Sequence, residues 1–314
     1  MVKIPRVIFS RTIVQELGFG KHVTTTGRMM NPDGTFNVER QPLTPWDNTY
    51  FHLVTMSWRR FFLLVFLGYI LLNLLFSGIY LLIGVDQFQG IQPGGFFHNL
   101  FSVFFFSTQT LSTVGYGHIS PIGWGANATA ALESFAGLLA IALISGLLYG
   151  RFSRPSAKIV FSPNLLIAPY RNREGLMLRM GNARKSELVE TEVQIILSMN
   201  QPDDEGNLTR RFFQIPLELS KISFFSLSWT VVHDIGEESP LWGLTIQEMR
   251  DANAEFMVLV KGVDEVNQQL VHTRHSYTGD EIVHNARFAP VIGRNRKGFP
   301  RVLTRNIGAY EPLA

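Results

Sequence analysis

Two long segments without charged residues constrain this chain more than any other feature. Residues 61–85 carry no charge, and a helix rising about 1.5 Å per residue needs only about 20 residues to cross a bilayer. Residues 124–150 are richer in Ala and Gly, as expected for close helix packing, and contain one acid, Glu133. A buried helix in a soluble protein is the alternative, but it would seldom be so long and uncharged. We predict transmembrane helices at about 60–85 and 124–150.

Basic residues at the outer ends of both segments predict the orientation. They are Arg59, Arg60, Arg151, Arg154 and Lys158, whereas residues 86–123 contain no Lys or Arg. By the positive-inside rule, both termini face the cytoplasm of a cell whose inner membrane the chain crosses twice. We expect no cleaved signal peptide, because the first 40 residues lack an apolar core. The net charge of +3 is too small to suggest nucleic acid, and without cysteine there are no disulfides or thiolate metal sites.

A short aromatic segment lies between the two predicted spans. Residues 97–109 are apolar but too few to cross a bilayer, so we predict a helix that enters the membrane and returns. Non-helical backbone at membrane depth is tolerated only inside protein or along water. Two spans per chain cannot enclose the returning segment, so several copies must form a closed ring, with cyclic symmetry as the natural solution.

The returning segment reads Thr-Val-Gly-Tyr-Gly at residues 113–117. A dehydrated cation needs oxygens in place of its water shell, and rings of backbone carbonyls supply them when successive carbonyls point the same way. Gly115 and Gly117 can adopt the positive φ values that this requires. The motif resembles the filter of potassium channels, which is built from four such loops, so we predict a potassium selectivity filter in a homotetramer, with K⁺ held by the carbonyls of Thr113, Val114, Gly115 and Tyr116. A chance Gly-Tyr-Gly turn is the alternative, which the position between two spans disfavours.

The rest of the chain divides into three parts. Residues 1–43 form an N-terminal cytoplasmic tail, and residues 44–57 predict an amphipathic interfacial helix, with a packed soluble helix as the alternative. After the pore domain of residues 58–155, residues 156–314 contain many short runs rich in β-branched and aromatic residues, separated by turns. Such a pattern without cysteines predicts an all-β immunoglobulin-like sandwich.

Several motifs resemble the inward-rectifier potassium channels, in their bacterial form. They are residues 151–155 (RFSRP), 182–190 (NARKSELVE), 239–241 (SPL), 274–277 (RHSY) and 281–283 (EIV). The resemblance covers roughly residues 40–310. It implies a potassium-selective tetrameric channel in which residues 44–57 correspond to the slide helix. Such a channel is not an enzyme and needs no cofactor besides the permeant K⁺.

The resemblance also implies roles for single residues of the pore. Ile141 lies where strongly rectifying relatives have an acid, so weak rectification is expected. Gly137 corresponds to the inner-helix hinge, and Tyr149 to the gate at the bundle crossing. Gln109 replaces a Glu that supports the filter in many relatives, so Glu133 could contribute to that support. The alternative for Glu133 is a purely structural hydrogen bond behind the pore wall.

Two groups of charged residues complete the expectations. Anionic phospholipids would modulate gating by binding basic residues at the inner membrane surface, which are Arg151, Arg154, Lys158, Arg184 and Lys185. The alternative is that these residues serve membrane topology alone. Acids that fall where relatives line the cytoplasmic pore are Glu190, Asp264 and Glu265, with a solvated charged face as the alternative. A membrane-anchored cytoplasmic sensor without conduction is the alternative for the whole protein, although it would not need the segment at 97–117.

Overall fold

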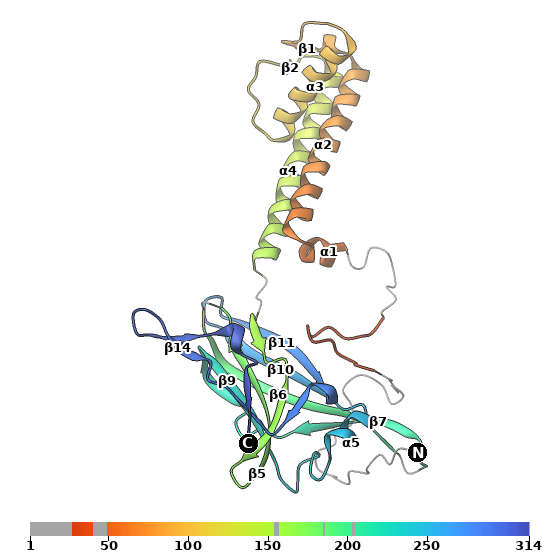
Figure 1. Cartoon of the computed structure of the whole chain (residues 1–314). Coiled ribbons are helices and arrows are strands. Elements are labelled where there is room, and N and C mark those ends of the chain that lie inside the picture. The colour runs from red at the N-terminus through yellow and green to blue at the C-terminus, as the bar shows by residue number, and fades with distance from the viewer. Residues whose placement is uncertain (1–26, 40–48, 154–156, 185, 203–204, 314) are drawn as a thin grey trace. The chain divides into compact units, whose positions relative to one another are not determined.

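The computed structural model describes residues 27–39, 49–153, 157–184, 186–202 and 205–313 (Figure 1). The chain divides into two units, a helical one of residues 41–154 and a second one that combines residues 1–40 with residues 155–314. The first five residues of the predicted interfacial helix, 44–48, lie outside the described residues, and so do Arg154 and Lys185.

Four helices build the helical unit. Helix α1 (Thr49–Thr55) precedes the long helix α2 (Trp58–Ile83). Helix α3 (Phe96–Leu111) is the short aromatic one, and α4 (Trp124–Phe152) is the second long one. Helix α2 ends at Gly84, whose φ of 107° suits glycine. The one-turn η1 (Val85–Gln87) and the antiparallel pair β1 (Phe88–Gln89) and β2 (Ser120–Pro121) complete the loops.

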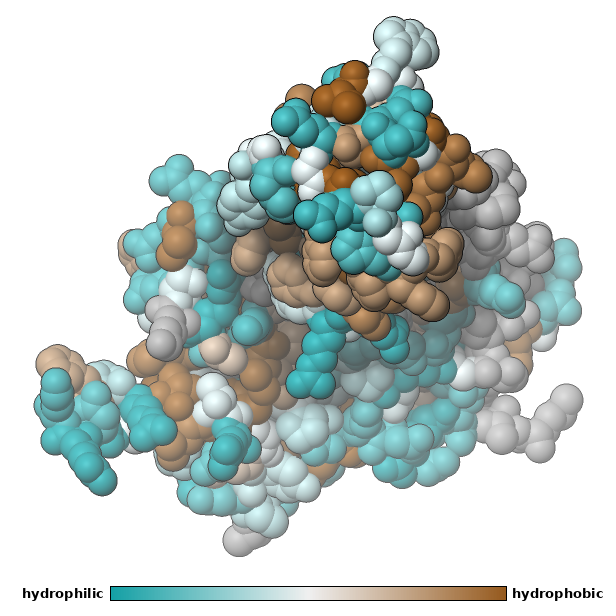
Figure 2. Space-filling model, turned by 90° about the horizontal axis from the view of Figure 1, so that it is seen from above, coloured by the Kyte–Doolittle hydropathy of each residue, from teal (hydrophilic) through white to brown (hydrophobic). Residues whose placement is uncertain are grey.

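Helices α2 and α4 are long and apolar enough to cross a membrane. Only 11% of the most apolar stretch of each is buried within one chain, so most of their apolar side chains face outward. Figure 2 shows this apolar surface beneath hydrophilic residues at the end of the unit. Inside the unit, the rings of Tyr80, Phe88 and Phe106 pack edge to face at 5.2–5.4 Å between centroids and join α2, β1 and α3.

The second unit contains two five-stranded sheets. The first has the order β11–β10–β6–β7, with β8 also paired to β6. Its strands are β6 (Leu188–Pro202), β7 (Leu208–Ile215), β8 (Lys221–Phe225), β10 (Glu255–Asp264) and β11 (Gln269–Thr278), and all these pairs are antiparallel. Buried and more exposed residues alternate along much of β6, as expected for a strand with one face on the core.

The second sheet has the order β12–β4–β5–β3, with β9 also paired to β5. Its strands are β3 (Ile159–Phe161), β4 (Leu165–Tyr170), β5 (Arg173–Asn182), β9 (Ser228–Ile235) and β12 (Ile282–His284). One core contains side chains of both sheets, including Leu178 and Val231 from this sheet and Val193, Phe213 and Phe256 from the other. The two sheets therefore form a sandwich, which confirms the all-β prediction for this domain.

Shorter elements surround the sandwich. Helix α5 (Ile246–Asp251) begins with a capping box, in which Thr245 and Glu248 satisfy each other's backbone N–H groups. The one-turn η2 (Gly279–Glu281) and η3 (Thr304–Asn306) are 3-10 helices. Two small antiparallel pairs lie near the C-terminus: β13 (Ala286–Phe288) with β16 (Tyr310–Pro312), and β14 (Ile292–Arg294) with β15 (Pro300–Val302).

A buried histidine predicts that the β-domain loses stability in acid. His233 on β9 is 1% exposed, its Nδ1–H donates to the Pro216 carbonyl (2.6 Å), and its Nε2 accepts from the Ser239 hydroxyl (2.7 Å). Burial lowers the pKa of His233 below the ordinary value of 6.5. The native state therefore excludes a proton that the unfolded chain binds below about pH 6.5.

We expect the thermal stability of the full chain in detergent to be constant above about pH 7 and to fall below about pH 6.5. Each excluded proton contributes up to about 1.4 kcal/mol per pH unit. His233→Gln should flatten the slope, leaving the contribution of His275, whose pKa burial also lowers. The exposed His272→Gln is the matched control and should keep the full slope. An unchanged slope in His233→Gln would contradict this account.

Candidate functional site: the pore helix and the filter loop

Backbone hydrogen bonds join the filter loop to the last turns of α3. The backbone N–H groups of Val114 and Gly115 both donate to the Gln109 carbonyl, at 2.9 and 3.3 Å, and the Thr113 N–H donates to the Thr110 carbonyl at 3.1 Å. Helix α3 therefore sets where the loop begins. Gln109 supports the loop through its backbone carbonyl, a contact that the prediction of a supporting side chain had not considered.

Positive φ angles alternate along the loop. Thr113 has a φ of 61°, Gly115 of 54° and Gly117 of 82°, whereas Val114 and Tyr116 between them do not have positive φ. Alternation of this kind turns successive carbonyls toward the same side, as a carbonyl-lined ion path requires. The two glycines were predicted from the sequence. Thr113 was not, because a β-branched residue seldom adopts this conformation and nothing in its side chain announces it.

A buried polar network joins three helices behind the loop. Glu133 on α4 accepts a hydrogen bond from the Tyr80 hydroxyl on α2 (2.6 Å) and another from the Ser107 hydroxyl on α3. Asn73 on α2 lies next to Ser107, with 3.0 Å between Asn73 Oδ1 and Ser107 Oγ. Tyr80, Asn73, Ser107 and Glu133 are each 0% exposed. An acid at this depth needs such partners.

Gly137 lies where α4 meets the end of α3. A Cβ atom at Gly137 would lie 2.1 Å from the backbone oxygen of Leu111, the last residue of α3. Only glycine permits so close an approach between the two helices. The structure therefore gives Gly137 a packing role, in addition to the hinge role that the family resemblance implies.

Ile141 and Tyr149 project from the same helix and are accessible in the single chain. Ile141 is 48% exposed and Tyr149 is 75% exposed. The cavity and gate roles of these two residues remain proposals.

Arg151, near the end of α4, contacts α1 and the first turn of α2 within one chain. Its guanidinium donates to the carbonyls of Leu53 (2.6 Å) and Met56 (2.7 Å) and lies 4.5 and 4.6 Å from the ring centroids of Trp58 and Phe61. The residue is only 9% exposed. This placement favours an internal structural role for Arg151 over the lipid contact expected from the sequence.

Replacing Arg151 by Met should lower the stability of the helical unit by about 3 kcal/mol. Hydrogen bonds from a charged group contribute about 1.5–3 kcal/mol each, and a cation–π contact about 0.5–2 kcal/mol. The melting temperature of the full chain in detergent measures the effect. Arg287→Met is the control, because its ion pair with Glu311 is exposed and worth little. Equal melting temperatures for the two variants would contradict this structural role of Arg151.

The charged residues predicted in the β-domain fall into two groups. Arg184 pairs at 2.5 Å with Asp264, whose side chain is 0% exposed and accepts from the Val266 N–H. Because the Asp264 carboxylate is buried and the Arg184 side chain is only 18% exposed, this pair favours a structural role over a lipid headgroup contact or a pore-lining ring. Glu190 and Glu265 are exposed, and Glu190 forms an ion pair with Lys221.

Exposed basic residues remain for the predicted lipid contact. Lys158 is exposed just before β3 in the β-domain unit. Arg59 and Arg60 are exposed in the first turn of α2 in the helical unit. In the sequence these two arginines predicted only the orientation of the spans, although their place at the end of a span was visible there. Arg154 and Lys185 lie outside the described residues.

Comparisons with known proteins agree with this architecture. Residues 159–309 match the inward rectifier potassium channel C-terminal domain, and residues 68–153 match a family described as ion channel. The chain is 39% identical to the inward rectifier potassium channel Kirbac3.1 of Paramagnetospirillum magnetotacticum. The 268 aligned residues cover 84% of this chain and 89% of the relative.

More distant relatives come from animals. The ATP-sensitive inward rectifier potassium channel 12 of Gallus gallus is 27% identical over 283 residues, 82% of this chain and 64% of the relative. The protein of that name from Bos taurus is 27% identical over 312 residues, 88% of this chain and 71% of the relative.

Two apolar helices with a pore helix between them, followed by an all-β domain, define a membrane ion channel protein, not an enzyme. The relatives narrow this class. The chain belongs to the inward rectifier potassium channel family, in its prokaryotic form.

Proposed function

We propose that four copies of this chain form a potassium-selective pore. The observation that carries the proposal is the alternation of positive φ at Thr113, Gly115 and Gly117, directly after a helix that ends at Leu111. The carbonyls of Thr113, Val114, Gly115 and Tyr116 would coordinate the dehydrated ion. The negative end of the α3 dipole near this loop favours a cation there.

Exposed apolar side chains support an assembly of several chains. Val114 is 54% exposed and Tyr116 is 77% exposed in the single chain. The proposal places both in a loop at membrane depth. Backbone at that depth must be enclosed by protein or line water. Neighbouring copies would cover these side chains, and filters of this type consist of four loops.

Further properties of the proposed channel rest on single residues. Ile141 in the cavity brings no charge to hold Mg²⁺ or polyamines, so rectification would be weak. Four Tyr149 rings would close the inner end of the pore. Anionic phospholipids would act on the exposed Arg59, Arg60 and Lys158, and Glu190 and Glu265 would concentrate cations in the cytoplasmic path. Both termini would face the cytoplasm.

Uptake of ⁸⁶Rb⁺ into proteoliposomes tests the proposal. We expect uptake that Ba²⁺ blocks and Na⁺ does not compete, and that changes with the fraction of anionic phospholipid in the vesicle. Uptake that Na⁺ competes would contradict a selective filter. Intact tetramers without uptake in any lipid, and still without uptake after Tyr149→Ala, would instead favour a membrane-anchored sensor.

A further inference from the structure

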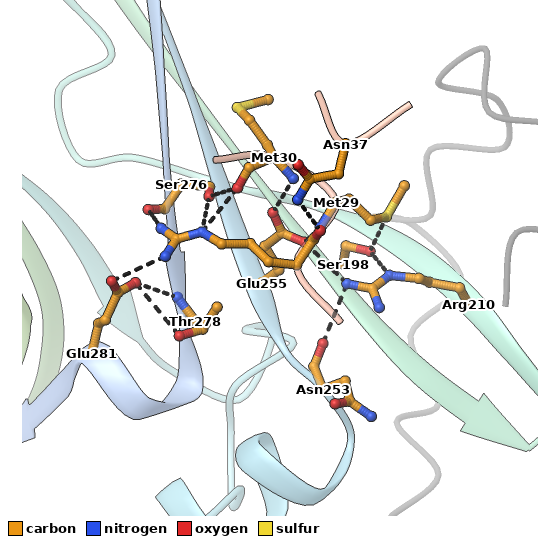
Figure 3. A network of polar contacts seen from close by, with 11 residues as sticks. Met29, Met30, Asn37, Ser198, Arg210, Asn253, Glu255, Ser276, Thr278 and Glu281 are labelled. Atoms are coloured by element: carbon orange, nitrogen blue, oxygen red, sulfur yellow. Dashed lines mark hydrogen bonds and ion pairs between the residues drawn. The ribbon is translucent and has the colours of Figure 1, made fainter. Parts of the chain in front are cut away.

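A buried carboxylate of the β-domain binds the chain's own N-terminal segment. Glu255 begins β10 and is 1% exposed. Its Oε2 accepts from the Met29 N–H (2.7 Å) and its Oε1 from the Met30 N–H (2.8 Å), as Figure 3 shows. Arg210 Nη2 lies 3.3 Å from the same Oε2. A buried charge needs such partners, so the segment supplies two of the hydrogen bonds that this site requires.

Further contacts hold the segment of residues 27–39 along β11. The Met30–Phe36 bridge closes it into a small hairpin, and Met29 and Met30 are only 4% and 3% exposed. The His275 Nδ1–H donates to the Pro32 carbonyl at 2.5 Å. Gly34, at a φ of 82°, lies so close to β11 that a Cβ atom there would be 2.7 Å from the Arg274 backbone oxygen. The segment is thus fitted to this sheet at both ends of its hairpin.

The position of the segment in the chain gives this docking a consequence. The chain passes from the β-domain unit into the helical unit between Arg40 and Gln41, and it returns between Arg154 and Pro155. The β-domain is therefore connected to the helical unit twice. The connection after Arg154 leads directly into the strands of the β-domain. The connection after Arg40 transmits movement of the domain only while residues 27–39 remain docked on it.

We propose that the Glu255 clamp makes the N-terminal segment a releasable second connection, which couples the β-domain to the pore. While residues 27–39 are docked, a movement of the domain also moves the chain that leads into α1. Once they are released, only the connection after α4 transmits it. This inference rests on the proposed channel function, because coupling is measured as a change in ion flux.

Two variants weaken the docking, one by a change in the β-domain and one by a change in the docked segment. Glu255→Gln removes the charge and one acceptor from the clamp, although it also leaves Arg210 without its carboxylate. Gly34→Ala keeps the clamp intact and places a methyl group against the Arg274 backbone. Gly298→Ala is the matched control, because its φ of 84° imposes the same local strain and a Cβ atom there meets nothing within 4 Å.

Hydrogen exchange of the full chain in detergent tests the docking itself. In both variants we expect the amides of residues 27–39 to exchange at least about tenfold faster than in the wild type, with amides of β6 and β10 away from the clamp unchanged. Gly298→Ala should leave the segment protected. Wild-type exchange as fast as that of an unstructured peptide, or unchanged protection in Gly34→Ala, would overturn the docking.

Ion flux then tests the coupling. The ratio of ⁸⁶Rb⁺ uptake in vesicles with and without anionic phospholipid should move toward 1 in Glu255→Gln and Gly34→Ala, by at least about half of its wild-type excess, and stay unchanged in Gly298→Ala. An unchanged ratio in variants whose segment is released would overturn the coupling. Absent uptake in both the wild type and Tyr149→Ala would overturn the channel function and the coupling with it, while the exchange data would still decide the docking.

Discussion

Replacing Gly115 by Ala should reduce K⁺ flux at least about tenfold and let Na⁺ compete. Gly115 has a φ of 54°, a conformation that costs an L-residue about 1–2 kcal/mol. In a ring of four loops this cost arises four times, for a total of about 4–8 kcal/mol. That is enough to favour a loop whose carbonyl no longer faces the ion path.

Parallel uptake of ⁸⁶Rb⁺ and ²²Na⁺ into proteoliposomes measures this effect. Two controls separate the filter from general strain. Val114→Ile keeps the backbone and changes only a side chain, and Gly298→Ala imposes a positive φ on alanine in the β14–β15 turn. Both should retain selective uptake. A wild-type ratio of Rb⁺ to Na⁺ uptake in Gly115→Ala tetramers would contradict the proposed filter.

Features of the fold that depend on local pattern were predictable. Uncharged length predicted α2 and α4, which lie at 58–83 and 124–152 where the sequence suggested about 60–85 and 124–150. The aromatic segment predicted a helix at 97–109, and α3 covers 96–111. Hydrophobic periodicity and missing charges act through neighbouring residues, so they can be read without knowing any long-range contact.

Contacts between distant residues were not predictable in the same way. The docking of residues 27–39 depends on Glu255, more than 200 positions away, and a short polar segment shows no periodicity that reveals it. The pairing of Arg184 with Asp264 turned two expected surface charges into an internal pair. Composition identifies charged residues, but only the packed sheets determine which of them are covered.

Gly137 allows two interpretations that predict opposite changes in stability. If the residue serves only as a hinge, Gly137→Ala should stabilise α4 by up to about 1 kcal/mol per chain, because alanine favours helix more than glycine does. If close packing is decisive, the added Cβ would meet the Leu111 backbone oxygen at 2.1 Å, and α4 would have to move away from the end of α3. Overpacking of this kind costs about 1–3 kcal/mol per site.

We expect the packing cost to dominate, because a backbone carbonyl at the end of a helix cannot rotate away as a side chain can. Gly137→Ala should lower the melting temperature of the full chain in detergent by several degrees and reduce ⁸⁶Rb⁺ uptake at least about tenfold, since the filter loop begins two residues after Leu111. Gly146→Ala, in the same helix with nothing within 4 Å of its added Cβ, should melt at or above the wild-type temperature. A raised melting temperature in Gly137→Ala would instead indicate that this glycine serves only as a hinge of α4.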